Sequence, residues 1–227
     1  MLEKRALREV EVLSRLAGHP FCCQLYDCFY SKCGAHIYMV LEKAEMDLND
    51  MLSRMLNGHL AEDAVRFYAA ELLLAIEHLH NNGFVWRDVK LENVLLRADG
   101  HLMIADFDLA TPDPDLIIEE EEEEGKRGED KVVHMTGTMD YLSPEVIQGG
   151  KHRTVSDYWA YGVLMYEIMF GQRPFAGWSQ DRTLYNITNK TLEFPRWAEV
   201  SKDATNFVNE LLRRAGYPRV DPMRRLG

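Results

Sequence analysis

The sequence contains Val85-Trp86-Arg87-Asp88-Val89-Lys90-Leu91-Glu92-Asn93-Val94-Leu95-Leu96 and, after a short polar break, Ile104-Ala105-Asp106-Phe107-Asp108. Four polar side chains in these stretches suit the transfer of a phosphoryl group, which depends on positioning and on neutralising charge. Asp88 can receive a hydroxyl proton, and Lys90 can offset charge on the moving phosphoryl group. Asn93 and Asp106 can supply oxygen ligands to magnesium.

Two short apolar segments, residues 94–96 and 102–104, lie on either side of the polar break. We expect them to pair as the strands of a hairpin, with Asn93 before the first strand and Asp106 after the second. Such a hairpin would direct both magnesium ligands to one place. An isolated Arg-Asp or Asp-Phe sequence is usually a loop ion pair or a turn, so the interpretation depends on further motifs in the same order.

Both stretches resemble catalytic motifs of eukaryotic protein kinases. The H-R-D-x-x-x-x-N motif corresponds to Trp86-Arg87-Asp88 through Asn93, and D-F-G corresponds to Asp106-Phe107-Asp108. The resemblance implies Asp88 as the catalytic base, Lys90 as the group that stabilises the transferring phosphoryl, and Asn93 and Asp106 as metal ligands. It also implies ATP and Mg2+ as cofactors and protein substrates as partners.

A later segment, Gly137-Thr138-Met139-Asp140-Tyr141-Leu142-Ser143-Pro144-Glu145, resembles the kinase G-T-x-x-Y-x-A-P-E motif, which shapes the platform for the substrate peptide. It implies that Thr138 orients the catalytic loop and that Glu145 pairs with Arg225. In the strongly apolar segment that ends at Phe170, Asp157 matches the buried aspartate that braces the catalytic loop. Without the resemblance, this segment is simply a buried helix.

Residues 2–16 have apolar side chains at a helical period, and Gly18-His19-Pro20-Phe21 ends the predicted helix. By residue type alone, Glu9 is a surface charge on an amphipathic helix. The resemblance instead makes Glu9 a nucleotide-site residue, the partner of the family's ATP-positioning lysine. It also implies a regulatory spine of four apolar side chains: Leu13, Leu25, Trp86 and Phe107.

Two strands are predicted at residues 23–29 and 36–41, and polar residues follow the second. The resemblance identifies Leu41 with the gatekeeper at the back of the nucleotide site. It implies that the backbone of Glu42-Lys43-Ala44 pairs with adenine. The implied nucleotide contacts in this part of the site are Glu42, Ala44 and Leu95.

Helices are predicted at residues 47–55 and 62–80, and Asn82-Gly83 ends the longer one. Its apolar side chains form a single stripe, which predicts a core helix. The stripe comprises Val65, Tyr68, Leu72, Ile76 and Leu79. His78 and His80, near the end of this helix, are interpreted as incidental.

The 227 residues carry a net charge of −11, and 46% of them are hydrophobic and 28% charged. This composition is ordinary for a globular protein that can bury a sizeable core. The negative charge opposes binding to nucleic acid or to an anionic membrane, and no apolar run is long enough for a membrane span. We therefore expect a cytoplasmic, intracellular protein, with the nucleus as a further location open to it.

All four cysteines, Cys22, Cys23, Cys28 and Cys33, fall in one short window. A zinc site is an alternative, but no C-x-x-C pair is present, and neighbouring positions on a strand face opposite ways. Free thiols in a reducing compartment are the preferred interpretation.

Residues 109–133 contain an unbroken acidic run from Glu119 to Glu124. Such a block repels itself and is usually solvated and disordered, and the alternative is a docking or autoinhibitory segment for a basic partner. In a kinase it would be an insertion in the activation segment, at about residues 112–131. The family's activating phosphosite falls on His134, with Thr136 as the nearest hydroxyl on which an upstream activating kinase could act.

Two features resemble the AGC group of Ser/Thr kinases: Glu62-Asp63-Ala64-Val65-Arg66-Phe67-Tyr68-Ala69-Ala70-Glu71 and the closing Arg225-Leu226-Gly227. The D-F-D sequence and the long activation segment further resemble the plant-type branch, which includes the phototropin-like kinases. Glu92, Glu167 and Asp47 match positions that receive substrate arginines in basophilic members. Guanidinium groups pair well with carboxylates, which gives this expectation a physical basis.

The resemblance implies an α+β, protein-kinase-like fold. A remnant N-lobe (helix C, two strands and the hinge) is expected at residues 1–44, and a mostly helical C-lobe at residues 45–227. No glycine-rich loop or V-A-I-K lysine precedes Glu9, and Lys4 lies on the same predicted helix, so we expect a domain truncated at both ends. Two functions stay open: a basophilic Ser/Thr kinase, or a catalytically inactive kinase-like interaction module that uses the acidic run.

Overall fold

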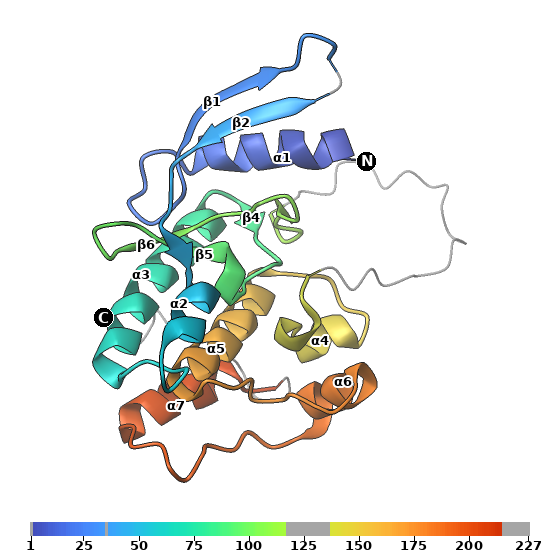
Figure 1. The fold of residues 1–227 in the computed structure, drawn as a ribbon. Coiled ribbons are helices and arrows are strands. Elements are labelled where there is room, and N and C mark those ends of the chain that lie inside the picture. The colour runs from blue at the N-terminus through green and yellow to red at the C-terminus, as the bar shows by residue number, and fades with distance from the viewer. Residues whose placement is uncertain (1, 35, 117–136, 215–227) are drawn as a thin grey trace.

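The computed structural model describes residues 2–34, 36–116 and 137–214 (Figure 1). Helix α1 (Leu2–Arg15) and the hairpin of β1 (Leu25–Tyr30) and β2 (Ile37–Leu41) lie together above a larger, mainly helical part (Figure 1). Helices and small sheets are mixed in the described residues, as the sequence predicts for an α+β chain.

The buried side of α1 is formed by Val12 and Leu13, and Leu16 after its end is buried too. Gly18 follows with a φ of 86°, a left-handed conformation that glycine adopts without steric cost at the end of a helix. Strands β1 and β2 pair antiparallel, with Phe29 opposite Tyr38 and the two rings stacked at a centroid distance of 5.6 Å. The predicted helix and both predicted strands are therefore confirmed, with ends that differ by one or two residues.

Two long helices, α3 (Glu62–Asn81) and α5 (Thr154–Phe170), pack against each other in the larger part, with α5 at its centre (Figure 1). Most of the predicted stripe of α3 is buried, and Tyr68 is half-buried with its hydroxyl donating to the Gly100 carbonyl at 3.3 Å. Helix α7 (Lys202–Leu211) packs on α5 at Gly162. A Cβ on Gly162 would meet the Leu211 Cβ at 2.7 Å, so only glycine permits this close helix packing.

The remaining elements are short. The helices are α2 (Leu48–Arg54), α4 (Pro144–Ile147) and α6 (Gln180–Asn189), with 3-10 turns η1 (Leu91–Asn93) and η2 (Met139–Tyr141). One sheet has the order β3 (Met46–Asp47), β5 (Val94–Leu96), β6 (Leu102–Ile104), and a second pairs β4 (Phe84–Val85) with β7 (Thr111–Pro112). The hairpin predicted at residues 94–96 and 102–104 is confirmed by the antiparallel pairing of β5 with β6.

Several predicted features lie outside the described residues: the acidic run from Glu119 to Glu124, His134, Thr136 and Arg225. Within the described parts of the chain, no helix is both long enough and apolar enough to cross a membrane.

The four cysteines, which are close together in the sequence, lie in two different environments in the structure. Cys22 and Cys23 are buried beside β6, whereas Cys28 and Cys33 are exposed on the hairpin. Over residues 2–34, 36–116 and 137–214, no three His, Cys, Asp or Glu side chains gather as a metal-binding group.

Candidate active site

The β5–β6 hairpin places Asn93 and Asp106 near one another. Val94 pairs with Ile104, and the amide of Ala105 donates to the carbonyl of Asn93 at 3.0 Å. Asn93 therefore lies beside the residue that precedes Asp106. The antiparallel register, in which the start of β5 meets the end of β6, is what brings the two predicted metal ligands to one end of the hairpin.

Three side chains converge on the carboxylate of Asp88, which is 5% exposed. Lys90 Nζ donates to Oδ2 at 2.6 Å, and Asn93 Nδ2 donates to the same oxygen at 3.0 Å. Thr138 Oγ1 donates to Oδ1 at 3.2 Å, from a segment 50 positions later in the chain. All four predicted catalytic residues therefore meet at one point, in a geometry that orients the Asp88 carboxylate.

The loop that carries Asp88 rests on the buried carboxylate of Asp157, in the first turn of α5. Asp157 accepts hydrogen bonds from the backbone amides of Trp86 at 2.8 Å and Arg87 at 2.9 Å. Arg87 has a φ of 69°, a left-handed conformation that costs energy in a residue with a side chain. The two bonds from Asp157 hold this strained turn in place, as the sequence resemblance implies.

His80 contributes to the same support. Its Nε2 lies 2.8 Å from Oδ2 of Asp157, although 77 positions separate the two residues. The interpretation of His80 as incidental is therefore wrong. His78 is not incidental either, because its ring stacks on the ring of His19 at a centroid distance of 4.3 Å.

Trp86 holds the backbone around Asp106 in place. The indole Nε1 of Trp86 donates to the Asp106 carbonyl at 3.0 Å, and the Trp86 and Phe107 rings lie 5.9 Å apart. Leu13, Trp86 and Phe107 are fully buried, and Leu25 packs partly buried against the same core. Asp106 itself has a φ of 62°, so both turns that carry site carboxylates contain a left-handed residue.

Nearly the whole chain matches the model of one protein family. Residues 1–226 match the family described as "Protein kinase domain". The chain belongs to this family. The protein-kinase-like α+β fold expected from the motifs is thereby confirmed, and this family generally uses ATP and Mg2+.

Three curated relatives illustrate the match. Phototropin-1A of Oryza sativa subsp. japonica is 36% identical, over 98% of this chain and 25% of the relative. Protein kinase PINOID of the same organism is 35% identical, over 99% of this chain and 52% of the relative. Serine/threonine-protein kinase UCNL of Arabidopsis thaliana is 34% identical, over 99% of this chain and 64% of the relative.

These relatives confirm the expected likeness to AGC-group kinases and to phototropins in particular. The chain spans a quarter of the length of the phototropins that it matches (25%).

Within this kinase domain, the charges around the two candidate metal ligands favour a cation. Burial and the neighbouring charge of Asp108 raise the pKa of Asp106, and Asp88 acts in the same direction. Burial opposes the charge of Lys90, but the hydrogen bond and charge of Asp88 outweigh it and raise the pKa of Lys90. A carboxylate and an amide oxygen are hard ligands that suit magnesium, which commonly takes one or two protein ligands and completes its shell with phosphate and water.

Glu9 faces the same site from α1. Burial, with the charges of Asp106 and Asp108, raises the pKa of Glu9 to about 7 from an ordinary value of 4.5, against an opposing hydrogen bond from the Phe107 backbone. Among the described residues Glu9 has no ion-pair partner. The structure therefore places Glu9 beside Asp106 and Asp108, as a carboxyl group that faces other carboxyl groups.

We expect this environment of Glu9 to make the kinase domain less stable as pH rises. Between about pH 4.5 and pH 7 the folded chain binds more protons at Glu9 than the unfolded chain does, so stability falls through that range. In thermal unfolding without magnesium, Glu9→Gln should flatten this fall and raise the Tm at pH 8. Glu11→Gln, at an exposed site on the same helix, is the control, and an equal change in both variants would contradict the prediction.

The predicted nucleotide contacts lie along β2, its continuation and β5. The side chain of Glu42 is directed toward Arg97, which leaves the Glu42 backbone for the predicted nucleotide contact. Ala44 is half-buried, and so is Leu95, whose strand neighbours Val94 and Leu96 are buried.

Sequence reasoning missed the partners of Glu167. Its carboxylate accepts from the Tyr141 hydroxyl and from Arg173 Nε, the latter at 3.1 Å. Arg173 also donates to Asp140 at 2.6 Å, which ties the substrate-platform segment to α5. The available signal was the Gly171-Gln172-Arg173 sequence just after α5, which places a cation six residues after Glu167.

Proposed function

We propose that this chain is a serine/threonine kinase domain in which Asp88 accepts the proton of the substrate hydroxyl. The observation that carries the proposal is the convergence of Lys90, Asn93 and Thr138 on the Asp88 carboxylate. If Asp88 served only in a salt bridge, one of these three donors would be enough. Three donors around one carboxylate, one of them the candidate magnesium ligand Asn93, with the second candidate ligand Asp106 nearby, support a catalytic arrangement.

The two oxygens of Asp88 have different surroundings. Oδ2 accepts two hydrogen bonds, from Lys90 and Asn93, whereas Oδ1 accepts one, from Thr138, among the described residues. Because a carboxylate oxygen has two lone pairs, Oδ1 retains one for a substrate hydroxyl. The substrate oxygen forms a bond to the γ-phosphorus of ATP, the bond from that phosphorus to the β–γ bridging oxygen breaks, and the hydroxyl proton passes to Asp88.

The other residues at the site supply charge and orientation. Lys90 offsets the negative charge of the transferring phosphoryl, and Thr138 holds the Asp88 carboxylate in a fixed rotamer. Asn93 and Asp106 would hold Mg2+, which neutralises charge on the phosphates when it is bound. Glu42, Ala44 and Leu95 would contact the nucleotide, and Glu9 would pair with an ATP-positioning lysine.

We infer a division of the chain between residues 44 and 45. Residues 1–44 form the small unit of α1, β1, β2 and the hinge, and residues 45–227 form the helical unit, with the acidic insertion at about residues 112–131. The arrangement of α1 and the hairpin above the helical part supports this division (Figure 1).

We infer that the substrate carries basic residues near the Ser or Thr. Glu92 is exposed, and its charge is among the causes that raise the pKa of Glu167, after burial. The two carboxylates are therefore electrostatic neighbours. Asp47 supports the inference less, because its Oδ1 already caps α2 by accepting from the Asp50 amide at 2.7 Å.

Glu92→Gln is expected to raise the KM for a peptide with arginine near the Ser or Thr by up to about fivefold, the upper end of the range for an exposed ion pair. The KM for the same peptide without arginine should stay unchanged. Steady-state kinetics with the two peptides make the comparison. An equal rise in both KM values would show that Glu92 does not recognise arginine.

The proposed function is tested by incubating the purified chain with ATP, Mg2+ and an array of Ser, Thr and Tyr peptides. Mass spectrometry should find phosphate on Ser or Thr and not on Tyr. Calorimetry with ATP provides a separate measure of nucleotide binding. Absence of both ATP binding and phosphate transfer would overturn the proposal.

A non-catalytic interaction module is the second candidate. The observation that favours it is Glu9, which faces Asp106 and Asp108 and has no ion-pair partner of its own among the described residues. The discriminating test is a pull-down with a basic peptide, in which replacement of Glu119 to Glu124 by glutamines should abolish capture. A module of this kind would capture the peptide without binding ATP.

A further inference from the structure

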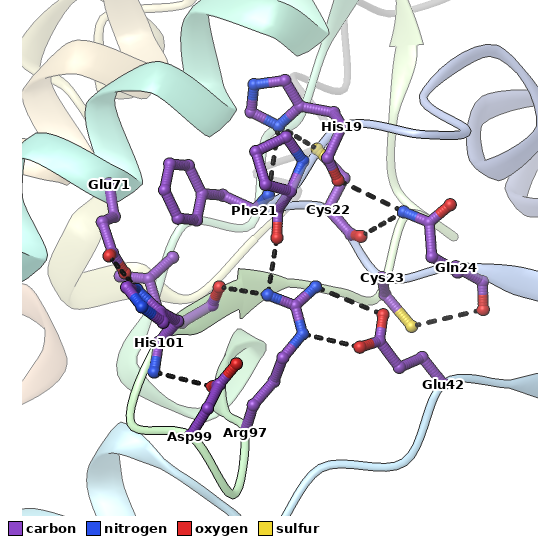
Figure 2. A network of polar contacts seen from close by, with 12 residues as sticks. His19, Phe21, Cys22, Cys23, Gln24, Glu42, Glu71, Arg97, Asp99 and His101 are labelled. Atoms are coloured by element: carbon purple, nitrogen blue, oxygen red, sulfur yellow. Dashed lines mark hydrogen bonds and ion pairs between the residues drawn. The ribbon is translucent and has the colours of Figure 1, made fainter.

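Arg97, the first residue after β5, connects three segments that are far apart in the sequence (Figure 2). Its Nε and Nη2 donate to the two carboxylate oxygens of Glu42 at 2.6 and 3.2 Å. Its Nη1 donates to the carbonyls of Pro20, at 2.5 Å, and Leu102, at 3.2 Å. A single guanidinium thus joins the turn after α1, the segment after β2 and the start of β6.

The ion pair between Arg97 and Glu42 is mostly buried. The side chains of Arg97 and Glu42 are each only 17% exposed. The hydrogen bonds of Glu42 outweigh the effect of burial and raise the pKa of Arg97. A planar guanidinium fork matches a carboxylate in two places, whereas a lysine ammonium cannot reproduce that geometry.

The backbone of residues 42–45 is fixed by a backbone hydrogen bond at each of its two ends. The Glu42 amide donates to the Gln24 carbonyl at 2.9 Å, and the Glu45 amide donates to the Leu96 carbonyl at 2.8 Å. Over the described ranges, no backbone hydrogen bond involves the amides of Lys43 or Ala44. These amides are free to meet a ligand, and their direction depends on how residues 42 and 45 are fixed.

Gln24 extends the support on the other side (Figure 2). Its Nε2 donates to the carbonyls of Cys22 at 2.7 Å and His19 at 3.2 Å. Gln24, whose carbonyl accepts the hydrogen bond from the Glu42 amide, is therefore itself bonded to the turn after α1. Arg97 bonds to the same turn through the carbonyl of Pro20. The contacts close a loop from Arg97 through Glu42 and Gln24 back to that turn.

We propose that Arg97 is a positioning residue for nucleotide binding, which fixes the backbone of residues 42–45 in the orientation that adenine requires. The inference deepens the proposed function and rests on it for the identity of the ligand. Arg97 lies outside the catalytic group and does not touch the reacting atoms. Its loss should therefore weaken ATP binding and leave the chemical step unchanged.

The test compares Arg97→Gln, Arg97→Lys, Glu42→Gln and the double variant R97Q/E42Q. Arg97→Gln is expected to raise the Kd and KM for ATP by about tenfold with kcat within twofold of wild type, and Arg97→Lys should recover only part of this loss. The double variant should bind ATP no more weakly than Arg97→Gln alone, because the two residues act as a pair. Arg66→Gln is the matched control, since Arg66 pairs with Glu62 on α3 and is 70% exposed.

Amide exchange gives a readout that does not require ATP. Arg97→Gln should speed exchange in residues 42–45 and leave α5 protected. Unchanged exchange there with wild-type ATP affinity, or faster exchange across the whole chain including α5, would overturn the proposal. If the wild-type chain binds no ATP, the proposed function fails, and unchanged exchange in residues 42–45 would then overturn the positioning role as well.

Discussion

Asp88→Asn is expected to lower phosphate transfer from ATP by about a thousandfold, within the range for loss of a general base. The asparagine keeps the size of the side chain, and its single amide oxygen can still accept on one side, either the bond that Lys90 donates to Oδ2 or the bond that Thr138 donates to Oδ1. It cannot take up the proton of the substrate hydroxyl. The measurement is transfer of labelled phosphate to a Ser or Thr peptide, with ATP affinity measured in parallel by calorimetry.

Asp63→Asn is the matched control for this experiment. The Asp63 side chain is 94% exposed on α3, and the same chemical change there should leave transfer at the wild-type rate. Retention of more than about a tenth of the wild-type rate in Asp88→Asn would rule out Asp88 as the proton acceptor, since such a loss is too small for a general base.

Asp157→Ala is expected to have the largest effect on stability, a loss of about 3 kcal/mol or more in the free energy of unfolding. The carboxylate is 1% exposed and accepts from two backbone amides and from His80. Its removal leaves these groups buried without a partner, and it releases the left-handed turn at Arg87. Urea unfolding at pH 7, followed by circular dichroism, measures the change.

Glu199→Ala is the control for stability, because Glu199 is exposed in a loop before α7. It should change the free energy of unfolding by less than about 0.5 kcal/mol. Asp157→Asn should lose less than Asp157→Ala, since one amide oxygen can still accept a hydrogen bond. Equal losses in Asp157→Ala and Glu199→Ala would contradict the bracing role.

The local part of the site was predictable from the sequence. Asp88, Lys90 and Asn93 lie within six residues of one another, and the β5–β6 hairpin that brings Asp106 to them is a short-range structure. Local chain geometry therefore limits where these side chains can go. Thr138 was predicted from the family motif alone, since nothing in its spacing links it to a residue 50 positions earlier.

The contacts that depend on distant packing could not be predicted in this way. His80 meets Asp157 because α3 and α5 pack side by side, and no local pattern reports that contact. Arg97 occupies a polar turn that looks solvated in the sequence, and its burial arises only where three separate segments meet. Glu167 carries the expected charge, but the sequence did not show that Tyr141 and Arg173 already bind it.

The contact between Trp86 and Asp106 gives this chain a built-in optical probe. Trp86 is fully buried, and its indole N–H is bonded to the carbonyl of Asp106, so its emission depends on the local conformation of the D-F-D segment. Trp178 and Trp197 are exposed, at 90% and 58%, and iodide would quench them selectively. In a Trp159→Phe background, the unquenched fluorescence would then come from Trp86 and follow rearrangement of that segment in real time.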